Sequence, residues 1–264
     1  MRGSVLAKAR KLYRALRHLV LRYDPRWRWR LISDAAVAVG KPGKCGYRTD
    51  IDKEALSRAY ILNQSRPAHR PLRFLDVGGR DGKLSYLLGN IGPLQFDQDT
   101  YDRNRAIFSA AYEYFGMDLI PAGANVLAGD MCSRVYLDDK REQVGTFDVV
   151  YSNEVFEHLA RPWIAVENID SLLRDGGLCV IVVPFSQRYH ESPGDYFRYT
   201  PDGIIELFRA AGRYEVLETG FDIRARRYDW QGNGDANDVC PSDKYGAWRE
   251  TWYSLAILRK TTPL

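Results

Sequence analysis

The sequence predicts an α/β fold in which a mainly parallel sheet carries helices on both faces. Apolar strand-like segments alternate with helix-like segments along most of the chain, and this alternation is typical of parallel strands joined by right-handed crossovers. The most informative segment, residues 74–84, runs from an apolar strand through a glycine-rich turn into an apolar-periodic helix. The 264 residues, of which 45% are hydrophobic, suffice for one sizeable domain with extensions.

The main domain is expected over residues 71–264, after an N-terminal extension over residues 1–70. Short apolar runs bounded by glycine, proline and polar residues predict its strands, and apolar positions at a period of 3.6 predict its helices. We expect strands at residues 72–77, 112–117, 125–129, 147–152, 177–184, 214–220 and 252–259, and helices at residues 53–63, 82–89, 101–110, 161–174 and 201–211.

The extension begins with a basic amphipathic helix over residues 4–23. Residues 1–30 hold ten Lys or Arg against one acid, Asp24, whereas the formal net charge of the whole chain is only +4. The rest of the chain is therefore slightly acidic, which argues against a nucleic-acid-binding surface. The helix either contacts an anionic membrane surface or an acidic partner, or packs on the domain with its charges in solvent.

The four cysteines lie far apart and form no C-x-x-C pair, which argues against a zinc site and against a disulfide framework. No His-x-x-x-His pair or dense carboxylate cluster indicates a metal ion, so we expect none. No apolar run approaches the ~20 residues that cross a bilayer. We expect a cytoplasmic protein, with peripheral contact at the inner membrane face through residues 1–30 as a further expectation.

The glycine-rich turn is the strongest functional signal. Gly78, Gly79 and Gly82 let the backbone approach a ligand closely, and the helix that follows offers unpaired N–H groups. The turn departs from G-x-G-x-x-G and resembles the first motif of the class I S-adenosylmethionine (SAM) dependent methyltransferases. That resemblance implies a Rossmann-like seven-stranded sheet closed by a C-terminal antiparallel hairpin. It also implies that Asp76, Gly78 and Gly79 hold the amino-acid end of SAM.

An acid at the end of the second strand binds the ribose hydroxyls in such enzymes, and two placements compete here. We favour Asp118, because residues 112–130 resemble a bacterial methyltransferase subgroup with a Y-x-G-x-D pattern. The rival, Asp99, stands at a more ordinary distance from Asp76, and the alternative stays open. Asp130 and Met131 are then placed to bind the adenine, unless Asp130 only caps a helix.

Residues 147–159 strongly resemble the fourth motif of the family, and residues 171–184 match the helix, glycine turn and fifth strand that follow it. By this resemblance Asn153 contacts SAM, and Glu154 or Glu157 lines the pocket. His158 corresponds to a structural residue at a helix end.

The segment after the fifth strand, residues 185–201, contains an H-x-x-P-x-D-Y-x-R-x-T pattern that resembles the same subgroup. It lies over the transferred methyl group, so we expect His190 to be the general base and Asp195 to hold its tautomer. In the alternative, His190, Asp195 and Arg198 only pin the loop, and Thr200 caps the next helix. Residues expected to contact the acceptor are Tyr196, Arg198 and Tyr199.

These motifs imply a SAM-dependent methyltransferase that methylates a hydroxyl of a small molecule, with a sugar or glycoconjugate as the expected acceptor. Methylation of nitrogen or carbon in a secondary metabolite is one alternative. A SAM-binding scaffold without catalysis is another, and the intact cofactor motifs count against it.

Overall fold

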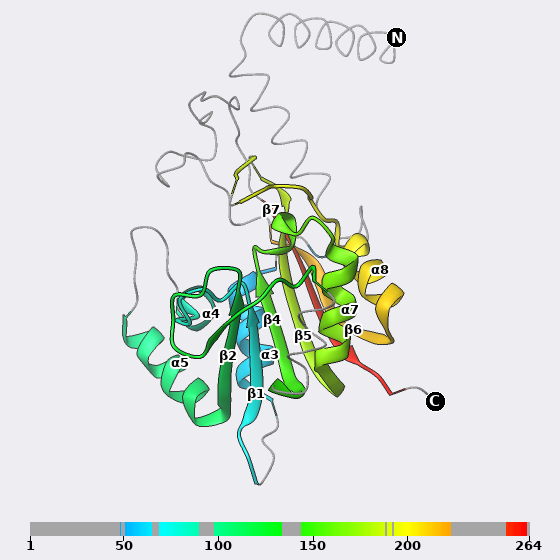
Figure 1. Ribbon diagram of the computed structural model, residues 1–264. Helices are drawn as coiled ribbons and strands as arrows, with labels where there is room; N and C mark the ends of the chain where they lie inside the picture. The colour runs from blue at the N-terminus through cyan, green and yellow to red at the C-terminus, as the bar shows by residue number, and fades with distance from the viewer. Residues whose placement is uncertain are drawn as a thin grey trace, which may run out of the picture. The chain divides into compact units, whose positions relative to one another are not determined.

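A seven-stranded sheet organises the part of the chain that the computed structural model describes (Figure 1). That part comprises residues 48, 51–64, 69–89, 98–133, 144–187, 189–191, 193–222 and 252–262. The strands are β1 (Leu72–Val77), β2 (Tyr112–Asp118), β3 (Val126–Ala128), β4 (Phe147–Asn153), β5 (Leu173–Ser186), β6 (Tyr214–Asp222) and β7 (Trp252–Lys260). The helices are α3 (Lys53–Leu62), α4 (Ser85–Leu88), α5 (Gln98–Ala111), the 3₁₀ turn η1 (Phe156–His158), α7 (Pro162–Leu172) and α8 (Pro201–Ala211).

The strand order β3-β2-β1-β4-β5-β7-β6 places β1 and β4 at the centre of the sheet. Strands β1 to β5 pair in parallel, and β7 is antiparallel to both β5 and β6. The predicted mainly parallel sheet with an antiparallel C-terminal pair is therefore confirmed. Because the strand order reverses on either side of β1, its carboxyl end is the point at which α/β sheets bind ligands.

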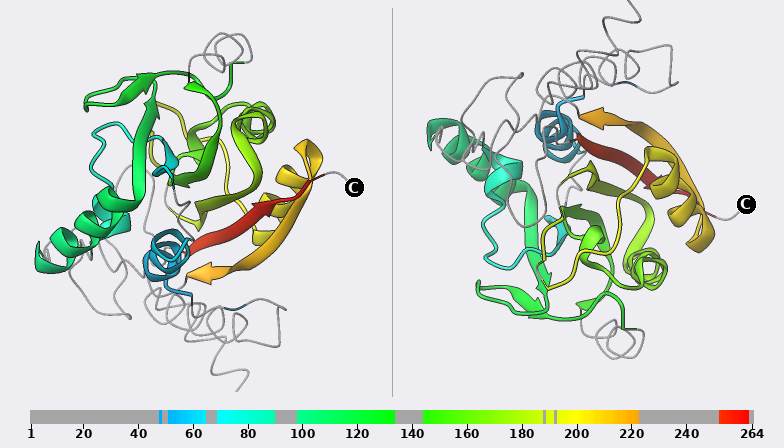
Figure 2. Two further views of the ribbon diagram at one scale, coloured as in Figure 1. Left: turned by 90° about the horizontal axis from the view of Figure 1, so that it is seen from below. Right: turned by 90° about the horizontal axis from the view of Figure 1, so that it is seen from above.

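Two apolar clusters cover opposite faces of the sheet, as the alternation of side chains along each strand requires. In β5, Cys179, Ile181 and Val183 belong to the cluster that α7 and α8 cover, whereas Leu178, Val180 and Val182 belong to the other. That second cluster includes side chains of α3, α4 and α5. Figure 2 shows helices on both sides of the sheet, as predicted.

The sequence places the helices well, except at the glycine-rich turn. The predicted helix at residues 82–89 is wrong in extent, because α4 covers only Ser85–Leu88. Gly82 and Leu84 have φ angles of +68° and 51°, which interrupt right-handed helix before it can begin. The helix predicted at residues 161–174 ends at Leu172, since Leu173 already pairs with Phe147 at the start of β5.

The basic helix expected over residues 4–23 lies outside the described residues. Over the part of the chain that is described, no helix is both long and apolar enough to pass through a bilayer.

Candidate active site

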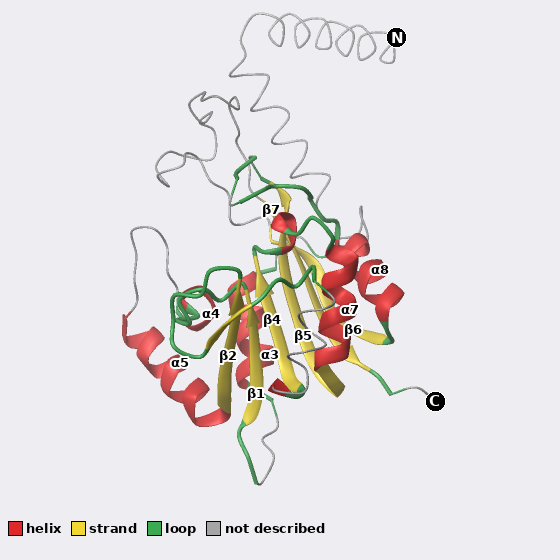
Figure 3. Cartoon of the chain, viewed as in Figure 1, coloured by secondary structure: helices red, strands yellow, loops and turns green. Residues whose placement is uncertain are grey.

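The carboxyl ends of the parallel strands bring the predicted site residues to one edge of the sheet. Figure 3 shows the loops that leave these strands as green segments. Val77 pairs with Met117 on one side and Ser152 on the other, and Asn153 pairs with Val182. The segments that follow β1, β2, β4 and β5 therefore lie side by side, although they are far apart in the sequence.

The turn after β1 has room only for glycine at two positions. Gly78 has a φ of +85°, and a Cβ atom there would lie 2.3 Å from Val155 Cγ2. A Cβ atom on Gly79 would lie 2.2 Å from Asp76 Oδ2 and 2.6 Å from the Tyr114 hydroxyl. Glycine is thus required at both positions because Val155, Asp76 and Tyr114 pack closely against the turn, which holds the Asp76 carboxyl group beside its backbone.

Asp76 is the acid of this turn, and its carboxyl group is buried beside Tyr114. The Tyr114 hydroxyl donates a hydrogen bond of 3.0 Å to Asp76 Oδ2. Burial raises the pKa of Asp76 to about 7, although the Tyr114 hydrogen bond lowers it and the nearby Asp81 and Asp118 raise it further. A cation that binds here would offset the cost of ionising the buried group.

Asp118 ends β2 next to β1, whereas Asp99 lies in the first turn of α5. The structure therefore places Asp118 at the carboxyl edge, where its Oδ1 accepts from the Ile120 amide at 2.8 Å. Asp130 follows β3, and its Oδ1 accepts from the Cys132 amide at 2.8 Å, which forms a turn; no helix begins in the described residues 131–133 for it to cap. Met131 is only 4% exposed and packs in the core.

Past β4, Asn153 ends the strand and Glu154 adopts a φ of 56°, which is uncommon for a residue with a side chain. Glu154 Oε1 lies 2.8 Å from Lys53 Nζ, and this ammonium group lies 3.3 Å from the centre of the Tyr253 ring. Sequence reasoning missed Lys53, because its contact with Glu154 spans 101 residues of sequence.

The segment after β5 is anchored by Asp195. Its carboxylate accepts from the His190 amide at 2.8 Å and pairs with the Arg198 guanidinium, whose Nη2 lies 2.7 Å from Oδ2. Burial alone would raise the pKa of Asp195, but these contacts hold it below its usual value. Thr200 caps α8 by accepting from the Gly203 amide at 3.0 Å. These contacts match the loop-anchoring alternative, which does not exclude chemistry at the His190 ring.

Two of the predicted acceptor-binding tyrosines differ in exposure. Tyr196 is 56% exposed, but Tyr199 is 8% exposed and its hydroxyl donates to the Phe156 carbonyl at 3.0 Å. Tyr199 is therefore placed to hold η1 against the loop rather than to contact an acceptor.

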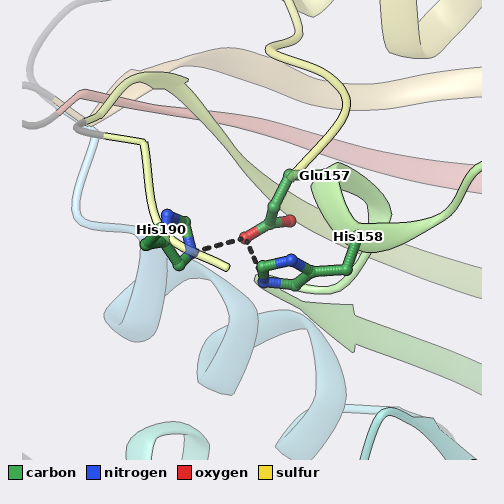
Figure 4. Close-up of side chains that lie close together, drawn as sticks. All are labelled: Glu157, His158 and His190. Carbon is green, nitrogen blue, oxygen red and sulfur yellow. Dashed lines mark ion pairs between the residues drawn. The ribbon is translucent and has the colours of Figure 1, made fainter. Parts of the chain in front are cut away.

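The structure also brings together Glu157, His158 and His190 (Figure 4). Glu157 Oε1 lies 3.7 Å from His158 Nε2 and 3.9 Å from His190 Nε2. The Glu157 side chain is fully buried, and burial raises its pKa to about 8. The signal in the sequence was the Glu-His pair at the family's fourth motif, but nothing in the spacing connects it to a histidine 32 residues later.

A cavity of about 200 Å³ lies beside the glycine turn, between β2, α4 and α5. Its lining includes Gly82, Tyr101 and Tyr114, but not Asp118 or Asp130. It is smaller than typical ligand pockets of about 300–1,000 Å³ and does not coincide with the expected ribose and adenine positions. The candidate site is therefore defined by the strand ends and not by this cavity.

Comparison with known proteins identifies the family of the chain. Residues 47–225 match a family model described as a methyltransferase domain. The ubiquinone biosynthesis O-methyltransferase of Parvibaculum lavamentivorans is 33% identical over 112 residues, which cover 42% of this chain and 39% of that protein. The protein of the same name from Caulobacter sp. strain K31 is 29% identical over 161 residues, which cover 60% of this chain and 56% of that protein. The matches thus span about two fifths to just over half of these curated relatives.

Two solved structures with a similar fold are described as methyltransferases. One is the methyltransferase in complex with the Trm112 activator of Haloferax volcanii, with a TM-score of 0.47 and 19% identity over 81% of this chain and 92% of that one. Another is the Burkholderia thailandensis 1,6-didemethyltoxoflavin-N1-methyltransferase with bound S-adenosylhomocysteine, with a TM-score of 0.41 and 17% identity over 90% of this chain and 91% of that one. Since the family model covers more than half of the chain, the protein belongs to the methyltransferase domain family, the class I SAM-dependent methyltransferases.

Proposed function

We propose that this protein transfers the methyl group of SAM to a hydroxyl group of a small molecule. The observation that carries the proposal is the shared edge of the sheet. A glycine turn packed against the buried Asp76 follows β1, and the Glu157–His158–His190 cluster follows β4 and β5. The carboxyl group of Asp76 suits a positively charged cofactor, and the side chains of the cluster can accept a proton.

Asp76, Gly78 and Gly79 would hold the amino-acid end of SAM, and Asp118 would accept hydrogen bonds from the ribose hydroxyls. Asp130, Met131 and Asn153 are the proposed contacts to the adenosyl group. Support comes from the position of these residues at or directly after the ends of β1 to β4. When bound, SAM supplies an electrophilic methyl carbon on a positively charged sulfur. The residues of the chain then have to align the acceptor oxygen with that carbon and remove its proton.

His190 is the proposed acceptor of that proton. Its Nδ1 lies 3.5 Å from Asp195 Oδ2, so the carboxylate can hold the tautomer in which Nε2 is unprotonated. Alignment of the reactants is the larger contribution, since it can lower a barrier by ~7–11 kcal/mol, whereas a general base typically adds ~10²–10⁴ in rate. Loss of His190 alone should therefore slow the reaction without abolishing it.

Oxygen is the proposed site of methylation, because the curated relatives are named O-methyltransferases of ubiquinone biosynthesis. The sugar or glycoconjugate acceptor expected from the sequence has no support from these names. A ring hydroxyl of a quinone precursor is therefore the first acceptor class to assay, and sugars are the second.

The test combines cofactor binding with methyl transfer in the full chain. Calorimetry should detect SAM binding that Asp76→Asn abolishes, whereas Asp175→Asn, on an exposed residue near the start of β5, should leave it intact. Radiolabelled SAM should then transfer its label to phenolic or sugar hydroxyl compounds. Transfer to amines or carbon acids alone would refute the choice of oxygen. SAM binding with no transfer to any acceptor class would instead indicate a scaffold.

A further inference from the structure

The carboxylate of Glu157 is fully buried, yet neither of its oxygens has a hydrogen-bond partner within the described part of the chain. Leaving a charged acceptor buried in this way costs several kcal/mol. Native structures keep such a group where something else compensates it, such as a proton, an ion or a ligand. Glu157 lies at the carboxyl edge of the sheet, directly after β4, so that compensation belongs to the candidate active site.

The two histidines beside Glu157 both turn the same ring nitrogen toward it. His158 Nδ1 lies 2.5 Å from the Gly194 carbonyl oxygen, which can only accept, so Nδ1 carries the proton. His190 Nδ1 faces Asp195 Oδ2 at 3.5 Å. Both rings thus present Nε2 toward Glu157, and the hydrogen bond to Gly194 leaves the lone pair of His158 on that nitrogen. This is the arrangement of histidines that bind metals, whose second nitrogen donates to a carbonyl or carboxylate.

We propose that Glu157, His158 and His190 bind one divalent transition-metal ion, of which Zn²⁺ is the best fit. Two imidazoles and one carboxylate are a ligand set of catalytic zinc sites, which leave a fourth position open. Ligand atoms around a tetrahedral zinc ion lie ~3.4 Å apart. Here the three atoms all lie within 4.8 Å of one another, and two of the separations are 3.7 and 3.9 Å. Small side-chain rotations would close the site.

A shared proton is the competing explanation, since burial raises the pKa of Glu157 to about 8. A proton on Glu157 compensates the charge of one carboxyl oxygen, but both oxygens are buried without a hydrogen-bond partner in the described residues. A metal ion satisfies all three groups together. This ligand set also favours zinc over Mg²⁺, which prefers oxygen ligands in octahedral geometry.

The role of the ion rests on the proposed function, although its binding does not. At the open position the ion would bind the acceptor hydroxyl and lower its pKa, as zinc does for water. The O–H bond breaks and the proton leaves to solvent. The oxygen then forms a bond to the methyl carbon as the carbon–sulfur bond breaks, which leaves S-adenosylhomocysteine as a neutral thioether. With the ion bound, His190 acts as a ligand and not as the base.

Metal content of the full chain tests the binding. After EDTA treatment and dialysis against Zn²⁺, the wild-type protein should hold about one ion that Mg²⁺ in excess does not displace. Glu157→Gln and His190→Gln should each weaken Zn²⁺ binding at least ~10-fold by calorimetry. His190→Gln is the safer variant, because its side chain is 36% exposed. His69→Gln and Glu191→Gln, on exposed residues outside the cluster, should bind zinc like the wild type.

Wild-type protein without stoichiometric zinc, or cluster variants that bind zinc as tightly as the controls, would overturn the proposal. A variant that fails to fold is identified by its thermal unfolding, and the remaining cluster variant then decides. Methyl transfer measured in the same samples separates the two proposals. Zinc binding without transfer contradicts the proposed function alone, and EDTA-resistant transfer without zinc binding contradicts the metal site alone.

Discussion

Replacing Tyr114 with phenylalanine should destabilise the protein more at high pH than at low pH. The Tyr114 hydroxyl donates a 3.0 Å hydrogen bond to the buried Asp76, whose pKa in the folded protein is about 7. At pH 5 Asp76 is protonated and the bond joins neutral groups, which contributes ~0.5–1.5 kcal/mol. At pH 9 Asp76 is ionised, and a bond to a charged group contributes ~1.5–3 kcal/mol. The loss should therefore grow by about 1 kcal/mol between these pH values.

The sign follows from linkage. The folded pKa of Asp76 is above its ordinary value of 3.8, so the folded state binds more protons than the unfolded chain between these values. The contribution of Asp76 to the free energy of unfolding is at its maximum below pH 3.8. As the pH rises toward 7, this contribution falls by up to about 4 kcal/mol. Without the Tyr114 hydroxyl the pKa of Asp76 rises by roughly one further unit, which extends the loss to higher pH.

Urea unfolding at pH 5 and pH 9 measures both losses, provided that the m-values agree. Tyr112→Phe is the matched control on the same strand, because its hydroxyl donates to the neutral Ile61 carbonyl at 2.5 Å. Its cost should be the same at both pH values. An equal cost of Tyr114→Phe at pH 5 and pH 9, or an equal pH dependence in the control, would refute the reasoning about Asp76.

Four further predictions concern the cofactor site and its support. SAM affinity should rise about tenfold from pH 6 to pH 8 as the ionised fraction of Asp76 increases, and a flat calorimetric profile would contradict this. Asp118→Ala should weaken SAM binding more than Asp99→Ala, and the reverse order would transfer the ribose role to Asp99. Gly79→Ala, with its Cβ 2.2 Å from Asp76 Oδ2, should displace that carboxyl group and weaken SAM binding more than Gly203→Ala in α8, whose nearest contact is 3.2 Å; equal affinities would show that the position of Asp76 beside the turn is not used. Asp148→Asn should lower the free energy of unfolding in urea by ~2–3 kcal/mol, because Asp148 accepts hydrogen bonds from Arg70 and the Arg73 amide, both at 2.7 Å. A loss below about 1 kcal/mol would contradict the stability assigned to these hydrogen bonds.

The strands could be predicted because each is a short apolar run, and β1, β4 and β5 are buried along most of their length. Alternation of these runs with helices then gave the parallel sheet. The start of α4 could not be predicted in the same way. Apolar periodicity over residues 82–89 indicates a helix, but the positive φ of Leu84 is set by the packing of the turn and not by local preference.

The candidate site could be predicted where its residues are contiguous in the sequence, as at the glycine turn. It could not be predicted where residues from distant parts of the sequence come into contact. Glu157 and His190 come together only because β4 and β5 are parallel neighbours, and Lys53 reaches Glu154 only because α3 lies against the same sheet. The sequence also gives no means of judging burial. The isolation of the Glu157 carboxylate, from which the metal site is inferred, is therefore a property of the tertiary structure alone.

Four buried carboxyl groups of the described residues divide into two kinds, and the division separates support from chemistry. Asp148 and Asp195 accept hydrogen bonds from arginine, so their pKa values are lowered despite burial and their charge is already compensated. Asp76 has the Tyr114 hydroxyl as its neighbour, and burial raises the pKa of Asp76 to about 7. Glu157 has two imidazoles as neighbours, and burial raises the pKa of Glu157 to about 8. A group of the second kind gains most from a cation that arrives from outside. The two ligands proposed for these positions, the amino-acid end of SAM with its ammonium group and a divalent metal ion, both bring positive charge. Each would bind at a buried carboxyl group that, within the described residues, forms no ion pair with lysine or arginine.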